Sequence, residues 1–235
     1  MPGLRWVELV VLYAVTPISL AWAFHRFAYR RAMAPLLWLA SGIAVAVLLR
    51  DPTFDRGMFF RIPLDPYLAV VALRFPLLAG PVLAMGRWLS PDEFLVLVRR
   101  RPGLWLAFGV LYTILSAVPQ GILFRVYFEH RFGALFESRA LLLVAGALVF
   151  SLGHVVFRNV PALVLTAVGG ALFLDTYLRT RSMLLAAAEH GAYGIVAFSA
   201  GLGKFLYLGR RPRERLPWPA SPWKPPAAPD PGSGV

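Results

Sequence analysis

The sequence VPQGILFR, residues 118–125, ends a long apolar run that begins near Leu104. Its last residue, Arg125, follows directly on apolar side chains. A charged side chain is costly inside a bilayer, so it usually faces the interior of a helix bundle and pairs with another group. Two later apolar runs also carry an ionisable residue, His154 in FSLGH and His190 in AEHGAYG. Ionisable groups on three hydrophobic segments predict one polar site that several membrane helices build together.

The composition is typical of an integral membrane protein. Hydrophobic residues make up 58% of the 235 residues and charged residues 15%, and the mean hydropathy is +0.64. Several runs approach the ~20 residues that an α-helix needs to cross a bilayer. A β-barrel would show short alternating segments instead. We therefore expect an all-α fold, a polytopic transmembrane helix bundle.

The apolar runs predict about seven to eight spans. Seven candidates are residues 6–27, 35–49, 67–85, 104–128, 141–157, 161–178 and 182–198. Residues 201–208 either extend the last of these or form a short eighth segment. Residues 1–208 would then be one membrane domain, followed by a disordered, basic, Pro-rich tail at residues 209–235.

Charge and cysteine content narrow the partners and the chemistry. The absence of cysteine excludes disulfides, thiolate zinc sites and cysteine nucleophiles. The net charge of +12 comes mostly from arginines between the apolar runs and in the tail. Anionic lipid headgroups explain this basicity more simply than nucleic acid does, so we expect membrane lipid and no nucleic acid among the partners. The expected location is a bacterial inner (plasma) membrane with a cytoplasmic C-terminus.

Arg74 is a further charge within an apolar run, in the third predicted span. We expect it to snorkel or to pair helices, because no other motif surrounds it. The alternative is a second charge near the polar site.

The three polar stretches resemble the motifs of the CPBP family of intramembrane proteases, also called CAAX-protease or Abi-like. The family pattern runs E-E-x-x-x-R, then F-x-x-x-H, then H-x-x-x-N or D. This chain matches the first motif at Arg125, the second in full from Phe150 to His154, and the third at His190. The resemblance covers roughly residues 104–200, the CPBP-like core.

The chain departs from the family pattern at three positions. Gln120 and Gly121 stand where the family has two glutamates, and Gly194 stands where it has Asn or Asp. In the family the glutamate pair is thought to supply the base that activates water. Glutamine cannot take a proton and glycine has no side chain. The family's fold is therefore expected, whereas its chemistry would need another base.

The resemblance implies an intramembrane endopeptidase, similar to CAAX prenyl protease 2, that cleaves a membrane-anchored protein or peptide. His154 and His190 would position water or the oxyanion, and Arg125 would brace the helices by hydrogen bonds. Glu189, nearly in the middle of its apolar run, is the candidate for a non-standard base. A structural role in the motifs is expected for Phe150, Gln120, Gly121 and Gly194.

Two neutral imidazoles can also bind a divalent metal such as zinc, as in a metalloprotease. Catalytic zinc usually has three protein ligands, so His154 and His190 alone make a poor zinc site.

Other functions stay open at this point. A catalytically inactive pseudoprotease would use the same helical cavity to bind a membrane partner. A small transporter or lipid-binding protein would have a polar cavity that only resembles the site. The family resemblance favours an enzyme, and the pair Gln120-Gly121 argues against one.

Overall fold

A computed structural model describes residues 2–27, 32–62 and 67–206. All regular elements in these ranges are helical, which confirms the all-α prediction. The α-helices are α1 Pro2–Val10, α2 Thr16–Phe27, α3 Met33–Arg50, α4 Tyr67–Leu89, α5 Val96–Arg100, α6 Pro102–Tyr112, α7 Val118–Gly121, α8 Phe128–Phe132, α9 Arg139–Gly153, α10 Val160–Thr180 and α11 Met183–Ser199. The π-helical segments are η1 Val11–Val15, η4 Thr113–Ala117 and η5 Ile122–Tyr127. The 3-10 segments are η3 Arg56–Phe59, η6 Gly133–Leu135, η7 Val155–Phe157 and η8 Leu202–Phe205. The predicted tail at 209–235 lies outside the described residues.

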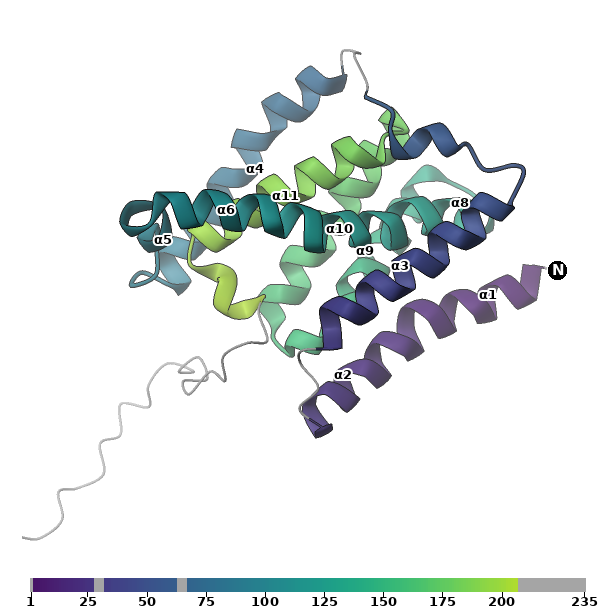
Figure 1. Ribbon diagram of the computed structural model, residues 1–235, viewed down its shortest axis with the longest axis horizontal. Coiled ribbons are helices and arrows are strands. Elements are labelled where there is room, and N and C mark those ends of the chain that lie inside the picture. The colour runs from purple at the N-terminus through teal and green to yellow at the C-terminus, as the bar shows by residue number, and fades with distance from the viewer. Residues whose placement is uncertain (1, 28–31, 63–66, 207–235) are drawn as a thin grey trace, which may run out of the picture.

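Each of the seven predicted spans coincides with a helical stretch. Among the described residues, five of these stretches are long and apolar enough to cross a membrane: 3–27, 33–50, 102–135, 139–157 and 160–180. The segment α11 is a shorter apolar helix of 17 residues, and the described part of the predicted eighth segment contains the four-residue 3-10 turn η8. In Figure 1, α1 and α2 run along one edge of the bundle and α4 lies at the opposite edge.

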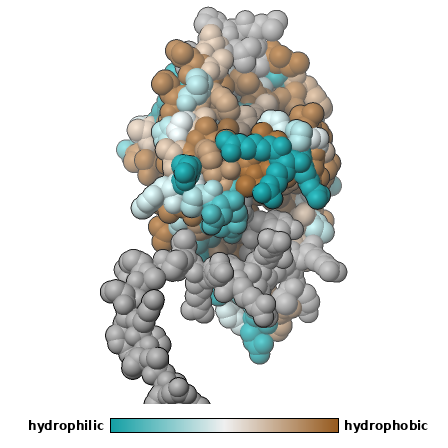
Figure 2. Space-filling model, turned by 90° about the vertical axis from the view of Figure 1, so that its left-hand side faces the viewer, coloured by the Kyte–Doolittle hydropathy of each residue, from teal (hydrophilic) through white to brown (hydrophobic). Residues whose placement is uncertain are grey.

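The outer faces of the helices are apolar, as contact with lipid requires. In α10, for example, Val160, Val164 and Val168 are exposed at every fourth position, whereas Ala162 and Thr166 are buried. Hydrophilic side chains gather instead at the end of the molecule that carries α5, as Figure 2 shows. The chain is therefore an integral membrane protein with a lipid-facing apolar surface.

The helix of residues 102–135 carries the first predicted motif and is interrupted by π turns and by a proline. Pro119 has no N–H, so it leaves the carbonyl of Leu115 without its usual α-helical partner. The indole Nε1 of Trp38, on α3, donates to that carbonyl at 3.1 Å. A side chain of a neighbouring helix thus replaces the hydrogen bond that the proline removes.

Two more carbonyls of this helix, at successive four-residue steps, accept a side-chain hydrogen bond in addition to a backbone one. The hydroxyl of Ser41 donates to Pro119 O at 3.0 Å, and the hydroxyl of Tyr13 donates to Leu123 O at 2.6 Å. Because a bilayer core offers no water to a freed carbonyl, such partners allow an irregular helix to persist there. The N-terminal helices therefore hold the motif helix in its broken shape.

We predict that Tyr13→Phe destabilises the fold by about 1 kcal/mol, because it removes a partly buried side-chain hydrogen bond to the carbonyl of Leu123. Tyr127→Phe is the matched control, since that hydroxyl makes only a 3.5 Å contact, to Glu8. Thermal unfolding of the purified protein in detergent measures the difference. Equal melting temperatures for the two variants would show that the Tyr13 hydroxyl does not hold the motif helix.

Candidate active site around Phe150

Phe150, on α9, is the ring on which the predicted site residues meet. Its centroid lies 4.6 Å from the ring of His154 and 5.4 Å from the ring of His190. The guanidinium carbon of Arg125 lies over the same ring at 4.5 Å. Three ionisable groups from η5, the end of α9 and α11 thus converge on one buried aromatic side chain, as the polar-site prediction requires.

Arg125 is held by aromatic faces. Its guanidinium lies between Phe150 and Phe173, at 5.0 Å from the second ring, and the residue is only 1% exposed. None of its three side-chain nitrogens has a hydrogen-bond partner among the described residues. The hydrogen-bonded brace that the resemblance implied is therefore wrong for this chain. Cation–π contacts supply about 2 kcal/mol each at best, less than the cost of burying a full charge.

His154 follows the last residue of α9 and is half-buried. Its Nδ1 lies 2.7 Å from the carbonyl oxygen of Phe150. A carbonyl only accepts, so Nδ1 carries the proton and Nε2 of the neutral ring is left with its lone pair. The backbone of α9 thereby fixes the tautomer that can accept a proton.

His190 is buried on α11 and stacks on Phe173, with centroids 4.8 Å apart and planes inclined by 22°. Its Nε2 lies 3.3 Å from the hydroxyl of Tyr112. Its Nδ1 is buried and has no hydrogen-bond partner among the described residues. One nitrogen of this ring is therefore open to a group that enters the site.

Tyr112 reaches His190 because Gly194 has no side chain. A Cβ at Gly194 would lie 2.1 Å from Cε1 of Tyr112, and one at Gly191 would lie 2.2 Å from Oγ1 of Thr113. The position that holds Asn or Asp in the family pattern is thus filled by the tyrosine ring of another helix. Sequence analysis missed Tyr112, whose only signal was a hydroxyl within an apolar run.

We predict that Gly194→Ala destabilises the protein by about 1–3 kcal/mol, because the new methyl group overlaps the rigid ring of Tyr112. Gly80→Ala, at a position on α4 with nothing within 4 Å, is the control. Thermal unfolding in detergent should separate the two. If Gly194→Ala is as stable as Gly80→Ala, the tyrosine does not occupy this space.

Glu189 contacts a different set of groups from its neighbour His190. Its Oε1 lies 2.7 Å from Nη2 of Arg74, on α4, and its Oε2 accepts the hydroxyl of Thr176, on α10. Arg74 also donates to Thr176 and, at 3.4 Å, to Asp175. Arg74 thus pairs α4 with α10 and α11. Both carboxylate oxygens of Glu189 thus already accept hydrogen bonds, and catalysis by Glu189 stays a prediction.

We expect Glu189→Gln to cost about 3 kcal/mol of stability, since it leaves the partly buried charge of Arg74 without its closest counter-charge. Asp55→Asn is the control, because it breaks an exposed pair, Arg61 to Asp55 at 2.8 Å. That exposed pair should contribute little. Chemical unfolding in detergent compares both variants with the parent, and similar losses would contradict a structural role for Glu189.

The first motif contributes no carboxylate to this site. The amide Nε2 of Gln120 donates to Ser116 Oγ at 2.8 Å, and Oε1 is buried without a partner. A Cβ at Gly121 would make ordinary contacts, 3.6 Å from Met183 Sδ and 3.8 Å from Ala187 Cβ. The structure thus gathers the arginine and histidines of the motifs, and it leaves space for a side chain at Gly121.

The donor set does not fit a catalytic zinc ion. Within the described part of the chain, no group of three His, Cys, Asp or Glu side chains is placed to hold a metal. The two imidazoles therefore lack the third protein ligand that such an ion usually has.

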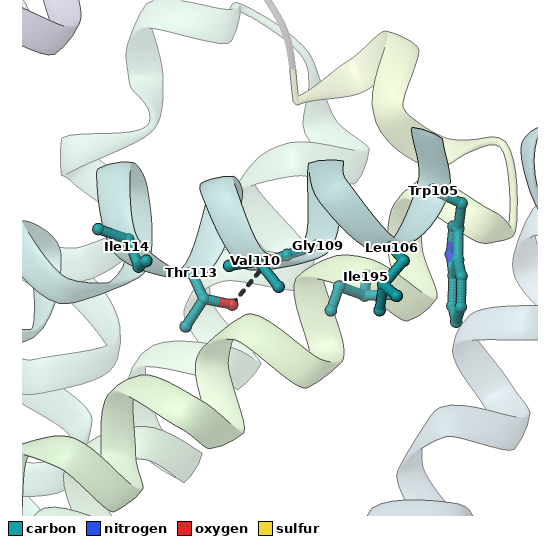
Figure 3. A pocket seen from close by; sticks show the side chains of 7 residues that line it. All are labelled: Trp105, Leu106, Gly109, Val110, Thr113, Ile114 and Ile195. Atoms are coloured by element: carbon teal, nitrogen blue, oxygen red, sulfur yellow. Dashed lines mark hydrogen bonds between the residues drawn. The ribbon is translucent and has the colours of Figure 1, made fainter. Parts of the chain in front are cut away.

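An apolar groove of about 270 Å³ runs beside the site, on the outer side of α6 and η4 (Figure 3). Its polar atom is Oγ1 of Thr113, which donates to Gly109 O at 2.9 Å. Thr113 also abuts Gly191, the residue after His190. The groove is lined by Trp105, Leu106, Gly109, Val110, Thr113, Ile114 and Ile195.

Comparison with known proteins gives one match. Residues 102–196 match the family model described as type II CAAX prenyl endopeptidase Rce1-like. No curated protein and no solved structure matches the chain. The matched segment begins with α6 and ends within α11, so it contains the whole cluster around Phe150 and excludes Tyr13, Trp38 and Arg74.

Proposed function

Because residues 102–196 match the family model described as type II CAAX prenyl endopeptidase Rce1-like, we propose that the protein is an intramembrane endopeptidase acting on a membrane-anchored protein or peptide. The observation that carries this proposal is the convergence of Arg125, His154 and His190 on the ring of Phe150. Those groups can serve as base and as oxyanion donor without the glutamate pair of the family pattern. The proposed location is a bacterial inner membrane, with the C-terminus in the cytoplasm.

In the proposed reaction, Nε2 of His154 takes a proton from a water molecule as that water attacks the carbonyl carbon of the scissile peptide. The carbonyl oxygen becomes an oxyanion, which the unpaired guanidinium of Arg125 stabilises with its N–H groups. The C–N bond then breaks, and the imidazolium returns its proton to the leaving amine. His190, through its free nitrogen, orients the water or the oxyanion.

The apolar groove supports a substrate with a lipid anchor. It opens on the outer face of α6, and its inner wall at Thr113 lies against α11 one residue beyond His190. A hydrocarbon chain in the groove would bury apolar surface against Leu106, Val110 and Ile195. The peptide attached to that chain would then be delivered toward the two histidines.

A second candidate, a pseudoprotease that binds a membrane partner without cleaving it, rests on a specific observation. Gln120 and Gly121 offer no base, and the oxygens of Glu189 are already held by Arg74 and Thr176. The same groove and aromatic cluster would then bind the partner only.

The test is cleavage of a farnesylated peptide with a CAAX end by the full chain in liposomes. A general base contributes about 10²–10⁴-fold, so His154→Ala should lower the rate by at least a hundredfold. His130→Ala is the matched control, because that histidine bonds Asp51 at 2.9 Å outside the site. The control should keep the parental rate, and a chelator should leave that rate unchanged. Unaltered cleavage by His154→Ala would reject His154 as the base.

Gly121→Glu and Gly121→Gln decide between the two candidates. A Cβ at this position makes only ordinary van der Waals contacts. The two variants differ only in whether the side chain ends in a carboxylate or in an amide. If the parent binds the peptide without cleaving it and only Gly121→Glu cleaves, the natural chain is a pseudoprotease. Cleavage by the parent, with no gain in Gly121→Glu, supports the endopeptidase.

A further inference from the structure

A second cavity lies between α2 and the segment that follows α9. None of its lining residues belongs to the cluster around Phe150. The cavity has a volume of about 440 Å³. Its apolar wall includes Ile18 and Trp22 of α2, and its charged wall includes Arg26 of α2 and Arg158, the residue that follows η7. Apolar and cationic groups therefore line one space, which nothing in the proposed proteolysis uses.

The two arginines have no acidic partner. Among residues 2–27, 32–62 and 67–206, no Asp or Glu side chain forms an ion pair with Arg26 or Arg158. His25 lines the same cavity and is fixed by a 2.9 Å contact of its Nε2 with Val156 O. The cavity thus presents two exposed guanidinium groups on a wall that also contains the fixed ring of His25.

The helix ends account for only part of this charge. Arg26 lies in the last turn of α2, whose C-terminus carries the equivalent of about half a negative charge. Most of the positive charge of the two arginines therefore remains uncompensated in the cavity. A guanidinium binds a phosphate through two parallel N–H···O bonds, so a phosphate monoanion matches the remaining charge and the geometry of the donors.

The cavity lies at the level of the lipid headgroups. Arg26 is the next-to-last residue of the candidate span Gly3–Phe27, and Arg158 directly follows the candidate span Arg139–Phe157. Trp22, 65% exposed, is the kind of residue that lies at a membrane interface. Ile18, on the apolar wall, lies one helical turn before Trp22 in α2 and therefore deeper in the bilayer, where acyl chains would run.

We propose that this cavity is a binding site for an anionic membrane phospholipid. The phosphate lies between Arg26 and Arg158, and an acyl chain follows Ile18 and Trp22 along the outside of α2. The bound lipid joins α2, outside the family-matched segment, to the end of α9, which carries His154. It would thereby hold the N-terminal helices against the part of the chain that contains the site.

The experiment is native mass spectrometry of the full chain released from nanodiscs of equimolar phosphatidylglycerol and phosphatidylcholine. We expect phosphatidylglycerol to be retained preferentially. An arginine near a membrane surface contributes about a fivefold factor, so Arg26→Gln and Arg158→Gln should each lower retention about fivefold. Arg100→Gln, which removes the same charge from α5, should retain the lipid as the parent does.

Three results would overturn the proposal. Equal loss in Arg100→Gln would show general attraction to a basic surface, and unchanged retention in both cavity variants would show that lipid binds elsewhere. Displacement of phosphatidylglycerol by inorganic phosphate alone would show a site for a free anion. If Arg158→Gln fails to fold, Arg26→Gln, at an exposed position of α2, decides the question by itself.

Discussion

The structure depends on hydrogen bonds to the backbone groups of an interrupted helix inside a bilayer. The helix of residues 102–135 contains two π segments and Pro119, and each interruption releases backbone groups that lipid cannot bind. Trp38, Ser41 and Tyr13 bind three of the carbonyls on one side of it. The irregular turns in turn carry Arg125 to the ring of Phe150. Helices outside the family-matched segment are thus part of what shapes the site.

Two arginines within the bundle, Arg74 and Arg125, have different surroundings. Arg74 has a close counter-charge in Glu189, so that centre is paired and ties three helices together. The guanidinium of Arg125 lies against the faces of Phe150 and Phe173, and its N–H groups have no hydrogen-bond partner among the described residues. Filling such unused donors is favourable, and the proposed function therefore places the oxyanion at the second centre and not at the first.

Another helix fills one of the positions at which the chain departs from the family pattern. Where the pattern has Asn or Asp, Gly194 lets Tyr112 bring a hydroxyl to His190 from another helix. Where the pattern has glutamates, Gln120 and Gly121 supply no charge, and Arg125 is left without a carboxylate. Within the described residues, the site therefore has the N–H groups of Arg125 and an Nε2 lone pair on His154, and the first motif adds no carboxylate.

The sequence by itself determined the helical class and the positions of the helices, and it led to the prediction that Arg125, His154 and His190 share one site. Hydropathy reports local transfer energies, and an ionisable group in an apolar run must find other polar or aromatic groups, so both signals are present in the linear chain. The partners of those groups were decided only by tertiary structure. Glu189 and His190 are adjacent in sequence but about 100° apart on their helix, so packing alone directs one to Arg74 and the other to Tyr112. The hydrogen bond from Tyr112 likewise depends on how closely two helices approach at Gly194, and no local pattern encodes that distance.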